Sequence, residues 1–406
     1  MSHKNPQIRT DLQFFPIQSS GNQVLLIKDH LGLVEEGKAV PSQLYGIMAL
    51  LDGTTTVRDI QMALMRQRGG ILVGTDEVER VLAGLDEAFL LDSERFRHAR
   101  QQIVARFAAQ PLRPCAHCGP SYPAEETELR KRLDEIIESQ PPVPPPEGRV
   151  TGLIAPHIDL SVGYKVYASA YQWLKHCAPS RVVVLGVGHQ MGDLFSLTEK
   201  DFETPLGRVK NERAAVHKLM KAGQSLMADS DFAHKSEHSV EFQVLFLQHL
   251  LPEQSFTIIP VLCGPLTPCL PEYTRKAYVE RTGPFLKALS EVLREGTQET
   301  LLVAGVDFSH IGPKFGHDAP ATLLQNQSKT HDQNLLKALA EVKAEEFWEE
   351  SIRENDQFNV CGFSALACLL EVLPPSRAQV LNYQLWHEQP TRSAVSFAAV
   401  AFTSLA

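Results

Sequence analysis

From residue 148 onward, short apolar segments alternate with longer amphipathic ones, and this alternation restricts the fold more than any other feature. The apolar segments are RVTGLIAP, SRVVVLGVG, FTIIPVLCG, ETLLVAGVD, AQVLNYQL and AVSFAAVAF. Amphipathic stretches such as residues 165–174 and 241–250 lie between them. Apolar strands that alternate with helices are typical of a sheet covered by helices on both faces. We therefore predict an α/β domain over residues 151–406.

The first hundred residues have a different pattern. Residues 22–37 are expected to form a β-hairpin around a glycine-containing turn. Short amphipathic helices should follow, one capped by Thr56 and another opened by a capping box of Asp76 and Glu79. The segment AFLLDSERF is expected to add a short closing strand or wing. A hairpin followed by short helices predicts a small winged-helix-like α+β domain over residues 1–100.

Residues 101–150 connect the two parts, and some of them are expected to belong to the second domain. A proline-rich run between residues 141 and 146 should form a stiff, extended connector. Cys115 and Cys118 form a single Cys-x-x-Cys pair, and no second pair follows at the spacing of a zinc site. We expect these two cysteines to be reduced thiols at a turn.

The net charge indicates which classes of partner the protein can bind, and the cysteine content indicates its cellular compartment. The net charge is −9, whereas nucleic acid and anionic membranes attract basic surfaces. The cysteines number seven, an odd total that suggests reduced thiols more than a disulfide framework. No apolar run approaches the roughly 20 residues that span a bilayer, and the start lacks a signal-peptide core. We expect a cytoplasmic protein with no nucleic-acid or membrane partner.

Polar residues follow three of the predicted strands, where ligands of open α/β sheets are found. His157 and Asp159 follow GLIAP, His189 follows VVVLGVG, and Asp307 and His310 follow LLVAGV. A single histidine at a strand end more often makes a structural hydrogen bond. Three such strand ends in one domain favour a functional site.

Two further segments can reach the same edge of the sheet. Glu237 and His238 precede an expected helix, and Glu241 lies four residues after Glu237, so the two carboxylates could share a face. Cys361 precedes another expected helix, whose N-terminus would stabilise a thiolate. The alternatives are ordinary helix capping for the glutamates and a buried, inert thiol for Cys361.

Several of these motifs together resemble the Memo family, known in bacteria as protein B of the AmmeMemoRadiSam system. LIAPH, VLGVGH, EHSVEFQVLFL, FTIIPVLCG, VDFSHIG, VCGFSALACLL, LNYQ and SAVSFAAVAF occur in the family's order, and HCGPSYPAEETELRKRL resembles its opening segment. The resemblance runs from about His117 to Thr403. It implies an α/β/α sheet domain like that of LigB-type extradiol dioxygenases, which hold non-haem iron.

The resemblance also implies a ligand set. Its metal ligands are His157, His189 and Cys361. The residues expected to act beside the metal are His310, Asp307, His238 and Glu237. Two imidazoles and a thiolate suit Fe²⁺, copper or zinc, and the resemblance favours iron. An open coordination position could bind dioxygen or a substrate oxygen while His310 or His238 moves protons.

The chain departs from the family pattern at two places. The family motif APHAGY is APHIDLSVGY here, which introduces Asp159, and Gln190 follows His189 where the family often has a second histidine. These departures affect the shape of the expected pocket and leave the three expected ligands in place.

The N-terminal region resembles PqqD-like peptide-recognition domains over most of residues 10–97. The resemblance is carried by LLIKDHLGLVEEGKAVPSQLYGIMALLDGTTTVRDI. Such domains bind a leader or tail peptide by adding a strand to a hairpin edge. DNA binding is the competing function of a winged helix. Residues 1–100 contain 11 Lys and Arg against 13 Asp and Glu, a net charge of −2, which argues against it.

Three functions remain open from the sequence. The first is a non-haem iron oxidoreductase that acts on an unknown small molecule with radical-SAM and AMMECR-type partner proteins. The second is a non-catalytic scaffold that binds peptides through the Memo pocket and the N-terminal module. The third is a cysteine hydrolase that uses Cys361 with a histidine.

Overall fold

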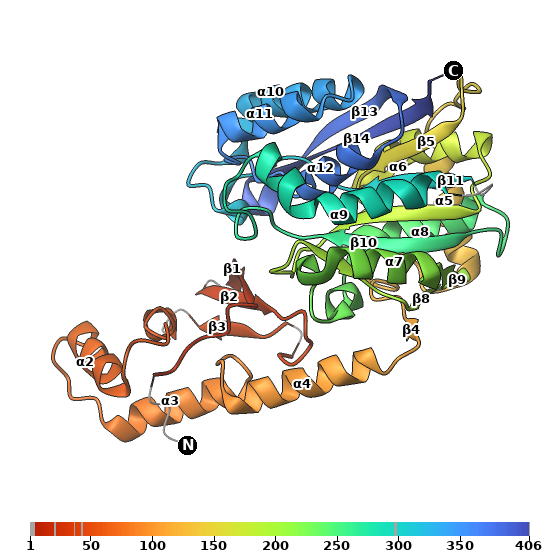
Figure 1. The fold of residues 1–406 in the computed structure, drawn as a ribbon. Helices are drawn as coiled ribbons and strands as arrows, with labels where there is room; N and C mark the ends of the chain where they lie inside the picture. The colour runs from red at the N-terminus through yellow and green to blue at the C-terminus, as the bar shows by residue number, and fades with distance from the viewer. Residues whose placement is uncertain (1–4, 20–21, 36, 42–43, 296–298, 406) are drawn as a thin grey trace. The chain divides into compact units, whose positions relative to one another are not determined.

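The computed structural model describes residues 5–19, 22–35, 37–41, 44–295 and 299–405. The chain divides into two compact units, Met1–Ala109 and Gln110–Ala406. Each unit is described by itself (Figure 1).

The described residues of the first unit form a three-stranded antiparallel sheet and four α-helices. The strands lie in the order β1-β2-β3. The strands are β1 (Gln13–Ser19), β2 (Asn22–Lys28) and β3 (Ala39–Pro41). The helices are α1 (Tyr45–Met48), α2 (Val57–Gln67), α3 (Thr75–Glu87) and α4 (Glu94–Ala108).

The hairpin predicted within residues 22–37 differs from the observed one. β2 forms its hairpin with β1, Ser19 pairing with Asn22, and β3 begins only at Ala39. The chain between β2 and β3 is organised by the Asp29 carboxylate, which accepts the amides of residues 31, 33 and 34. A side-chain-organised loop has no tight-turn signature, which is why the second strand was misplaced.

The helix starts in this unit test the predicted capping residues. Thr56 caps α2 and forms a capping box with Asp59, which confirms the predicted cap. α3 begins after Gly74 without a side-chain cap, so the predicted box of Asp76 and Glu79 is wrong. AFLLDSERF contributes only an isolated bridge at Leu91, and its second half opens α4 behind a serine cap, so the predicted wing is wrong.

The second unit is built on an eleven-stranded mixed sheet in the order β12-β14-β5-β11-β6-β10-β9-β8-β4, with β13 paired to β14 and β7 to β10. The six predicted strands are β5 (Val150–Ala155), β6 (Arg181–Val187), β10 (Thr257–Cys263), β11 (Thr300–Gly305), β13 (Ser376–Glu388) and β14 (Ser393–Ser404). The others are β4 (Leu112–Arg113), β7 (Phe195–Leu197), β8 (Asp201–Thr204), β9 (Gly207–Asn211) and β12 (His310–Ile311). The α/β fold is therefore confirmed.

Helices cover both faces of this sheet. One face packs against α7 (Arg213–Gly223), α9 (Arg275–Arg294), α10 (Ala321–Ala340), α11 (Ala344–Glu354) and α12 (Phe363–Val372). The other packs against α5 (Glu126–Glu138), α6 (Leu160–Tyr171) and α8 (His238–Leu250). β6 supplies both cores, because Val183 and Leu185 enter the first and Val182 and Val184 enter the second.

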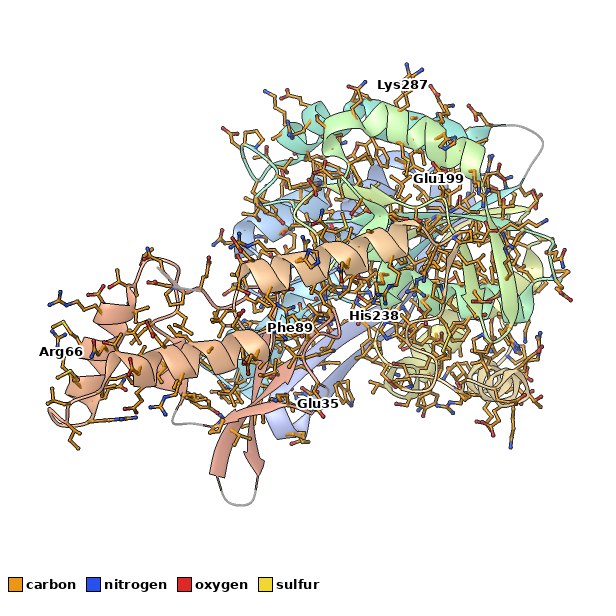
Figure 2. All side chains as sticks on the ribbon, turned by 90° about the horizontal axis from the view of Figure 1, so that it is seen from below. Glu35, Arg66, Phe89, Glu199, His238 and Lys287 are labelled. Carbon is orange, nitrogen blue, oxygen red and sulfur yellow. A yellow bond between two sulfur atoms is a disulfide. The ribbon has the colours of Figure 1, made fainter. Side chains whose placement is uncertain are left out.

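The central strands bring their carboxyl ends to one edge. β5, β11, β6 and β10 run parallel, and Ala155 pairs with Gly305 across the last residues of β5 and β11. Residues that follow these strands must therefore lie close together. In Figure 2, His238 lies among packed side chains of this unit, whereas Lys287 of α9 projects outward.

Short 3-10 helices complete the second unit. They are η2 (Gln172–His176), η3 (Gln224–Leu226), η4 (Asp231–Lys235), η5 (Pro313–Phe315) and η6 (Gln389–Thr391). Across the described part of the chain, every helix is too short or too polar to span a lipid bilayer.

Candidate metal centre

His157 is held rigidly at the end of β5. Its backbone amide donates to Asp307 at 3.0 Å, and its ring Nδ1 lies 3.0 Å from the Gly305 carbonyl oxygen. The carbonyl oxygen can only accept a hydrogen bond, so Nδ1 carries the ring proton and Nε2 is the basic ring nitrogen. Nε2 lies 3.5 Å from the sulfur of Cys361. Burial lowers the pKa of His157 to about 3, which keeps the ring neutral.

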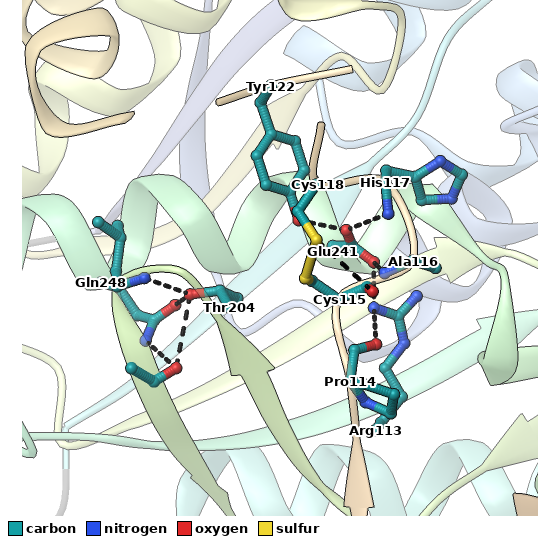
Figure 3. The surroundings of a disulfide bond; sticks show 12 residues. Arg113, Pro114, Cys115, Ala116, His117, Cys118, Tyr122, Thr204, Glu241 and Gln248 are labelled. Atoms are coloured by element: carbon teal, nitrogen blue, oxygen red, sulfur yellow. Dashed lines mark hydrogen bonds and ion pairs between the residues drawn. A yellow bond between two sulfur atoms is a disulfide. The ribbon is translucent and has the colours of Figure 1, made fainter. Parts of the chain in front are cut away.

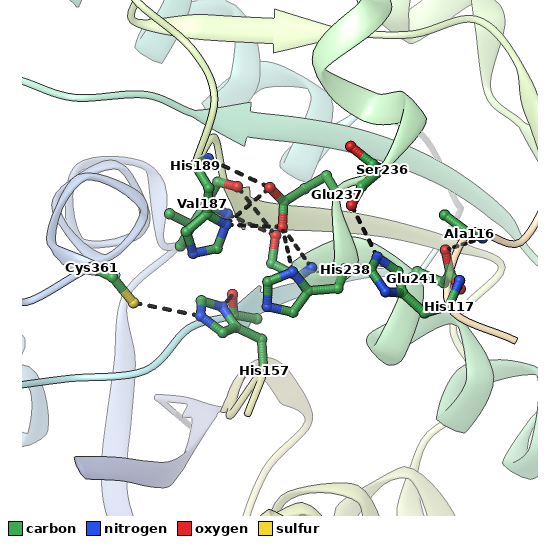
Figure 4. Close-up of polar contacts among 12 residues, drawn as sticks. Ala116, His117, His157, Val187, His189, Ser236, Glu237, His238, Glu241 and Cys361 are labelled. Carbon is green, nitrogen blue, oxygen red and sulfur yellow. Dashed lines mark hydrogen bonds and ion pairs between the residues drawn. The ribbon is translucent and has the colours of Figure 1, made fainter. Parts of the chain in front are cut away.

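His189 follows β6 and is oriented by a carboxylate. Its Nδ1 lies 2.9 Å from Oε2 of Glu237. Its ring centroid lies 5.0 Å from that of His157 at a steep angle. A carboxylate that accepts from Nδ1 fixes the tautomer and makes Nε2 the nitrogen suited to a metal. The two imidazoles therefore present the same ring nitrogen toward one point (Figure 4).

Cys361 is placed by a glycine that allows two segments to approach closely. Gly362 caps α12, and a Cβ at this position would lie 2.5 Å from Cβ of Val306 and 2.7 Å from the Asp307 carbonyl oxygen. The sulfur of Cys361 itself lies 3.6 Å from that carbonyl. Only glycine lets the chain bring the thiol against the strand end that carries Asp307.

The expected thiolate stabilisation at Cys361 is not observed. Burial raises the pKa of its thiol well above the usual value, and the carboxylates of Asp307 and Glu237 add to the rise. The helix N-terminus does not overcome these effects. A thiolate at this position therefore requires a cation beside it.

Glu237 and His238 lie next to these three residues. The Glu237 side chain caps α8 by accepting the Ser239 amide at 2.9 Å. Burial alone would raise the pKa of Glu237, but the facing His189 and His238 hold it well below its usual range. The His238 ring stacks on His189 at 5.0 Å and lies 5.0 Å from His157. His189, Glu237 and His238 thus form a second donor set that shares His189 with the first.

Asp307 and His310 border the centre from the β11 end. The Asp307 carboxylate is buried and accepts the amides of His157 and Ile158, and burial raises its pKa to about 6. Nδ1 of His310 lies 2.9 Å from the Phe308 carbonyl oxygen, and burial lowers its pKa to about 4. Among the described residues, neither joins the two donor sets.

Asp159 and Glu241 turn away from the centre. Asp159 is exposed and caps α6 by accepting the Ser161 amide, and among the described residues it joins neither donor set. Glu237 stands before α8 as its cap, and Glu241 therefore does not share its face. Glu241 instead pairs with Arg113 of β4 and binds the segment between β4 and α5 through the amides of Ala116 and His117.

That segment contains a residue that the sequence analysis missed. Nε2 of His117 lies 2.9 Å from the Ser236 carbonyl oxygen, and its ring lies 5.6 Å from that of His238. It lies between Cys115 and Cys118, which form a disulfide with their Cα atoms 5.8 Å apart. The prediction of reduced thiols is wrong for this pair, because the turn brings them within disulfide range. The signal that could have found it is the HCGPSYP motif, of which His117 is the first residue.

The donor set fits a divalent transition metal. One ligand atom each from His157, His189 and Cys361 lies within 4.8 Å of the other two. Both imidazoles are oriented by hydrogen bonds at Nδ1, as metal-binding histidines commonly are. Nitrogen and sulfur donors suit Fe²⁺, copper and zinc better than Mg²⁺ or Ca²⁺.

Comparison with known proteins agrees with the motifs. The sequence model of the Memo-like protein family matches residues 113–401. A MEMO1 family protein of Aquifex aeolicus is 30% identical over 399 residues, covering 97% of this chain and 100% of that protein. A second, from Thermus thermophilus, is 30% identical over 343 residues, covering 84% of this chain and 97% of that protein. The chain therefore belongs to the Memo family.

Proposed function

We propose that this protein is a metal-dependent redox enzyme whose centre is held by His157, His189 and Cys361, with Fe²⁺ as the preferred ion and copper or zinc as alternatives. The single observation that carries the proposal is the convergence of three ligand atoms within 4.8 Å. The three residues come from three separate segments, so the convergence is a property of the folded sheet.

A bound redox metal would supply an open coordination position for dioxygen or a substrate oxygen together with electron transfer. Glu237 holds the His189 ring at its angle, and the Gly305 carbonyl does the same for His157. These contacts fix the donors before a ligand arrives, which lowers the cost of binding.

His238 and His310 are the residues proposed to move protons. The side chain of His238 is 32% exposed and stacks on His189, so it can exchange protons with both solvent and a molecule at the centre. His310 lies on the side of Asp307; the Asp307 side chain is buried and that of His310 is half-buried. A substrate bound between His238 and His310 would meet a proton carrier on each side.

Metal content tests the proposal. The full-length protein would be purified without oxygen, and its bound metals would be measured beside those of His157→Ala and Cys361→Ala. His217→Ala is the matched control, because this surface histidine pairs with Glu199 away from the centre. Near-stoichiometric iron that both site variants lose and the control retains would support the proposal. Full metal retention in His157→Ala would exclude the assigned site.

Peptide-binding scaffolding is the second candidate, and a feature of the first unit favours it. Among the described strands, β1 pairs only with β2, so its other edge is available for an added strand. We propose a tail peptide of a radical-SAM or AMMECR-type protein as the occupant. Pull-downs with and without residues 1–109 test this, and partner capture that is unchanged by the deletion would contradict it.

A cysteine hydrolase would use the same pair of residues as the metal centre. Cys361 lies 3.5 Å from the basic nitrogen of His157, within reach of proton transfer. We favour the ligand role because His189 also converges there. Labelling of Cys361 by a thiol-directed reagent only in the metal-free protein would support the ligand role.

We propose the cytoplasm as the location of the protein.

A further inference from the structure

The disulfide between Cys115 and Cys118 closes a very short loop. Only Ala116 and His117 separate the two cysteines, and both half-cystines are partly exposed. A disulfide that closes so few residues removes little entropy from the unfolded chain, so it contributes little as a structural crosslink. Partial exposure leaves the bond accessible to an attacking thiolate.

A buried carboxylate already holds this loop. Glu241 accepts the amides of Ala116 and His117, each at 3.0 Å, and also binds Arg113 and the Tyr122 hydroxyl (Figure 3). Burial alone would raise the pKa of Glu241, but Arg113 and its hydrogen-bond donors hold it below the usual value. The loop therefore has an ionic anchor in addition to the disulfide.

The same loop touches the segment that orders the metal centre. The Nε2–H group of His117 donates to the Ser236 carbonyl oxygen, and the His117 ring lies edge-on to that of His238 (Figure 4). Glu237, the carboxylate that orients His189, lies between Ser236 and His238 in the sequence. A displacement of His117 would therefore reach the centre through a single short segment.

We propose that Cys115 and Cys118 form a reversible thiol–disulfide exchange site whose reductant is a dithiol, and that its redox state controls how firmly His117 holds residues 236–238. The other cysteines found as free thiols are Cys177, Cys263, Cys269, Cys361 and Cys368. Among the described residues, Cys115 and Cys118 are the cysteines joined in a disulfide, whereas the other five are free thiols.

The exchange is balanced by the dithiol itself. A thiolate of the dithiol attacks one sulfur, the S–S bond breaks, and the other cysteine leaves as a thiolate that takes up a proton. The second thiol of the reductant then closes its own disulfide and releases the first cysteine as a thiol. The protein pair gains two electrons and two protons, and the dithiol loses the same number.

The first experiment titrates the native full-length protein with defined ratios of reduced and oxidised dithiothreitol, followed by alkylation and intact-mass measurement. We expect two alkylation sites, Cys115 and Cys118, to appear together at one midpoint. Cys115→Ser and Cys118→Ser should each abolish the transition, and the control Cys177→Ser should leave the midpoint unchanged. The rate of reduction by dihydrolipoamide is then compared with the rate by a Cys-x-x-Cys reductase at equal driving force. The faster of the two shows whether the reductant is a small dithiol or a protein dithiol. A pair that becomes reactive only after unfolding would overturn the proposal.

The second experiment measures amide hydrogen exchange over residues 113–122 and 236–241 in each redox state. We expect exchange of both segments to be roughly tenfold faster or more in the reduced protein. His117→Phe should still undergo the thiol–disulfide transition, but residues 236–241 should no longer respond to it. Equal exchange of the second segment in both states of the wild type would overturn the coupling.

The effect on metal binding rests on the proposed function and is measured separately. After removal of the dithiol, Fe²⁺ would be titrated into the oxidised and the reduced protein under anaerobic conditions. We expect the two affinities to differ severalfold in the wild type and to be equal in His117→Phe. Equal wild-type affinities would overturn the link to the centre. Absence of binding in both states would refute the proposed metal centre while leaving the exchange site supported by the first two experiments.

Discussion

The Glu237 carboxylate lies 2.9 Å from Nδ1 of His189 and also accepts the amide of Ser239 in the first turn of α8. One side chain thus joins the end of β6 to the start of a helix on the sheet's face. Neither residue could orient the other without the sheet and helix being in place. The geometry of the candidate centre therefore depends on the packing of α8 against the sheet.

Glu237→Gln should weaken metal binding by about 10–100-fold, the range found when a residue that orients a metal ligand is replaced. The amide retains the shape of the side chain but loses the charge that fixes the His189 tautomer. Metal titration of the purified protein measures the change. Glu199→Gln is the control, because Glu199 makes a similar contact with His217 far from the centre. Unchanged affinity in Glu237→Gln would show that His189 needs no carboxylate.

Gly362→Ala should lower the stability of the second unit by about 1–3 kcal/mol, the usual cost of overpacking, and should displace Cys361. The added methyl group would lie 2.5 Å from Cβ of Val306 and 2.7 Å from a backbone oxygen. Urea unfolding followed by tryptophan fluorescence reports on this unit, because Trp173, Trp348 and Trp386 all belong to it.

The matched control for this substitution is Gly84→Ala in α3. A Cβ there would meet nothing within 4 Å. Alanine in an exposed helix interior should stabilise the first unit by about 0.5–1 kcal/mol. Because that unit contains no tryptophan, the fluorescence transition of the second unit should not move in Gly84→Ala. Equal effects of the two substitutions would contradict the close approach described at Gly362.

Glu241→Gln should destabilise the second unit by about 3–5 kcal/mol at neutral pH, because it leaves the buried Arg113 guanidinium without its counter-charge. The folded protein holds the pKa of Glu241 below its ordinary value of 4.5. This stabilisation is therefore complete above pH 4.5 and is lost as the pH falls through the lower, folded-state pKa.

The difference in unfolding free energy between the wild type and Glu241→Gln should accordingly be constant near neutral pH and shrink on acidification. Urea unfolding at a series of pH values measures it. A difference that grows as the pH falls would mean that Glu241 is not ionised in the folded protein.

Asp29→Ala should unfold or strongly loosen the first unit while leaving the second intact. Asp29 binds the buried guanidinium of Arg9 and accepts three amides of the following loop. Removing one partner of a buried ion pair costs about 3–5 kcal/mol. Limited proteolysis should cut residues 5–109 rapidly, with unchanged tryptophan fluorescence. Asp11→Ala is the control, since the Asp11 side chain is 42% exposed. Equal protection of both variants would contradict this role of Asp29.

The sequence was sufficient wherever one strong local signal decided the structure. Apolar runs such as RVVVLGV predicted the central strands correctly, because a strand buried on both faces needs little else. The parallel strand ends then placed His157 and His189 near each other. That they bind metal stays a prediction, which the experiments above test.

The misplaced features depended on side-chain contacts and helix starts that turn, capping and spacing patterns do not encode. The Asp29 loop replaced an expected tight turn, and the start of α8 at His238 turned Glu241 away from Glu237. The Cys115 loop closed because Glu241, 126 residues after Cys115 in the numbering, holds its amides. Local patterns carry no information on partners so far along the chain.

The order of strands has a consequence for when the centre can form during synthesis. β14 lies between β12 and β5, so β5 remains an edge strand until residues 393–404 have left the ribosome. Cys361 is also synthesised late, because it lies closer in the sequence to β14 than to β11. A nascent chain that has made only His157 and His189 therefore presents two histidines on an unfinished sheet. Stable metal loading would accordingly report that translation of the domain is complete.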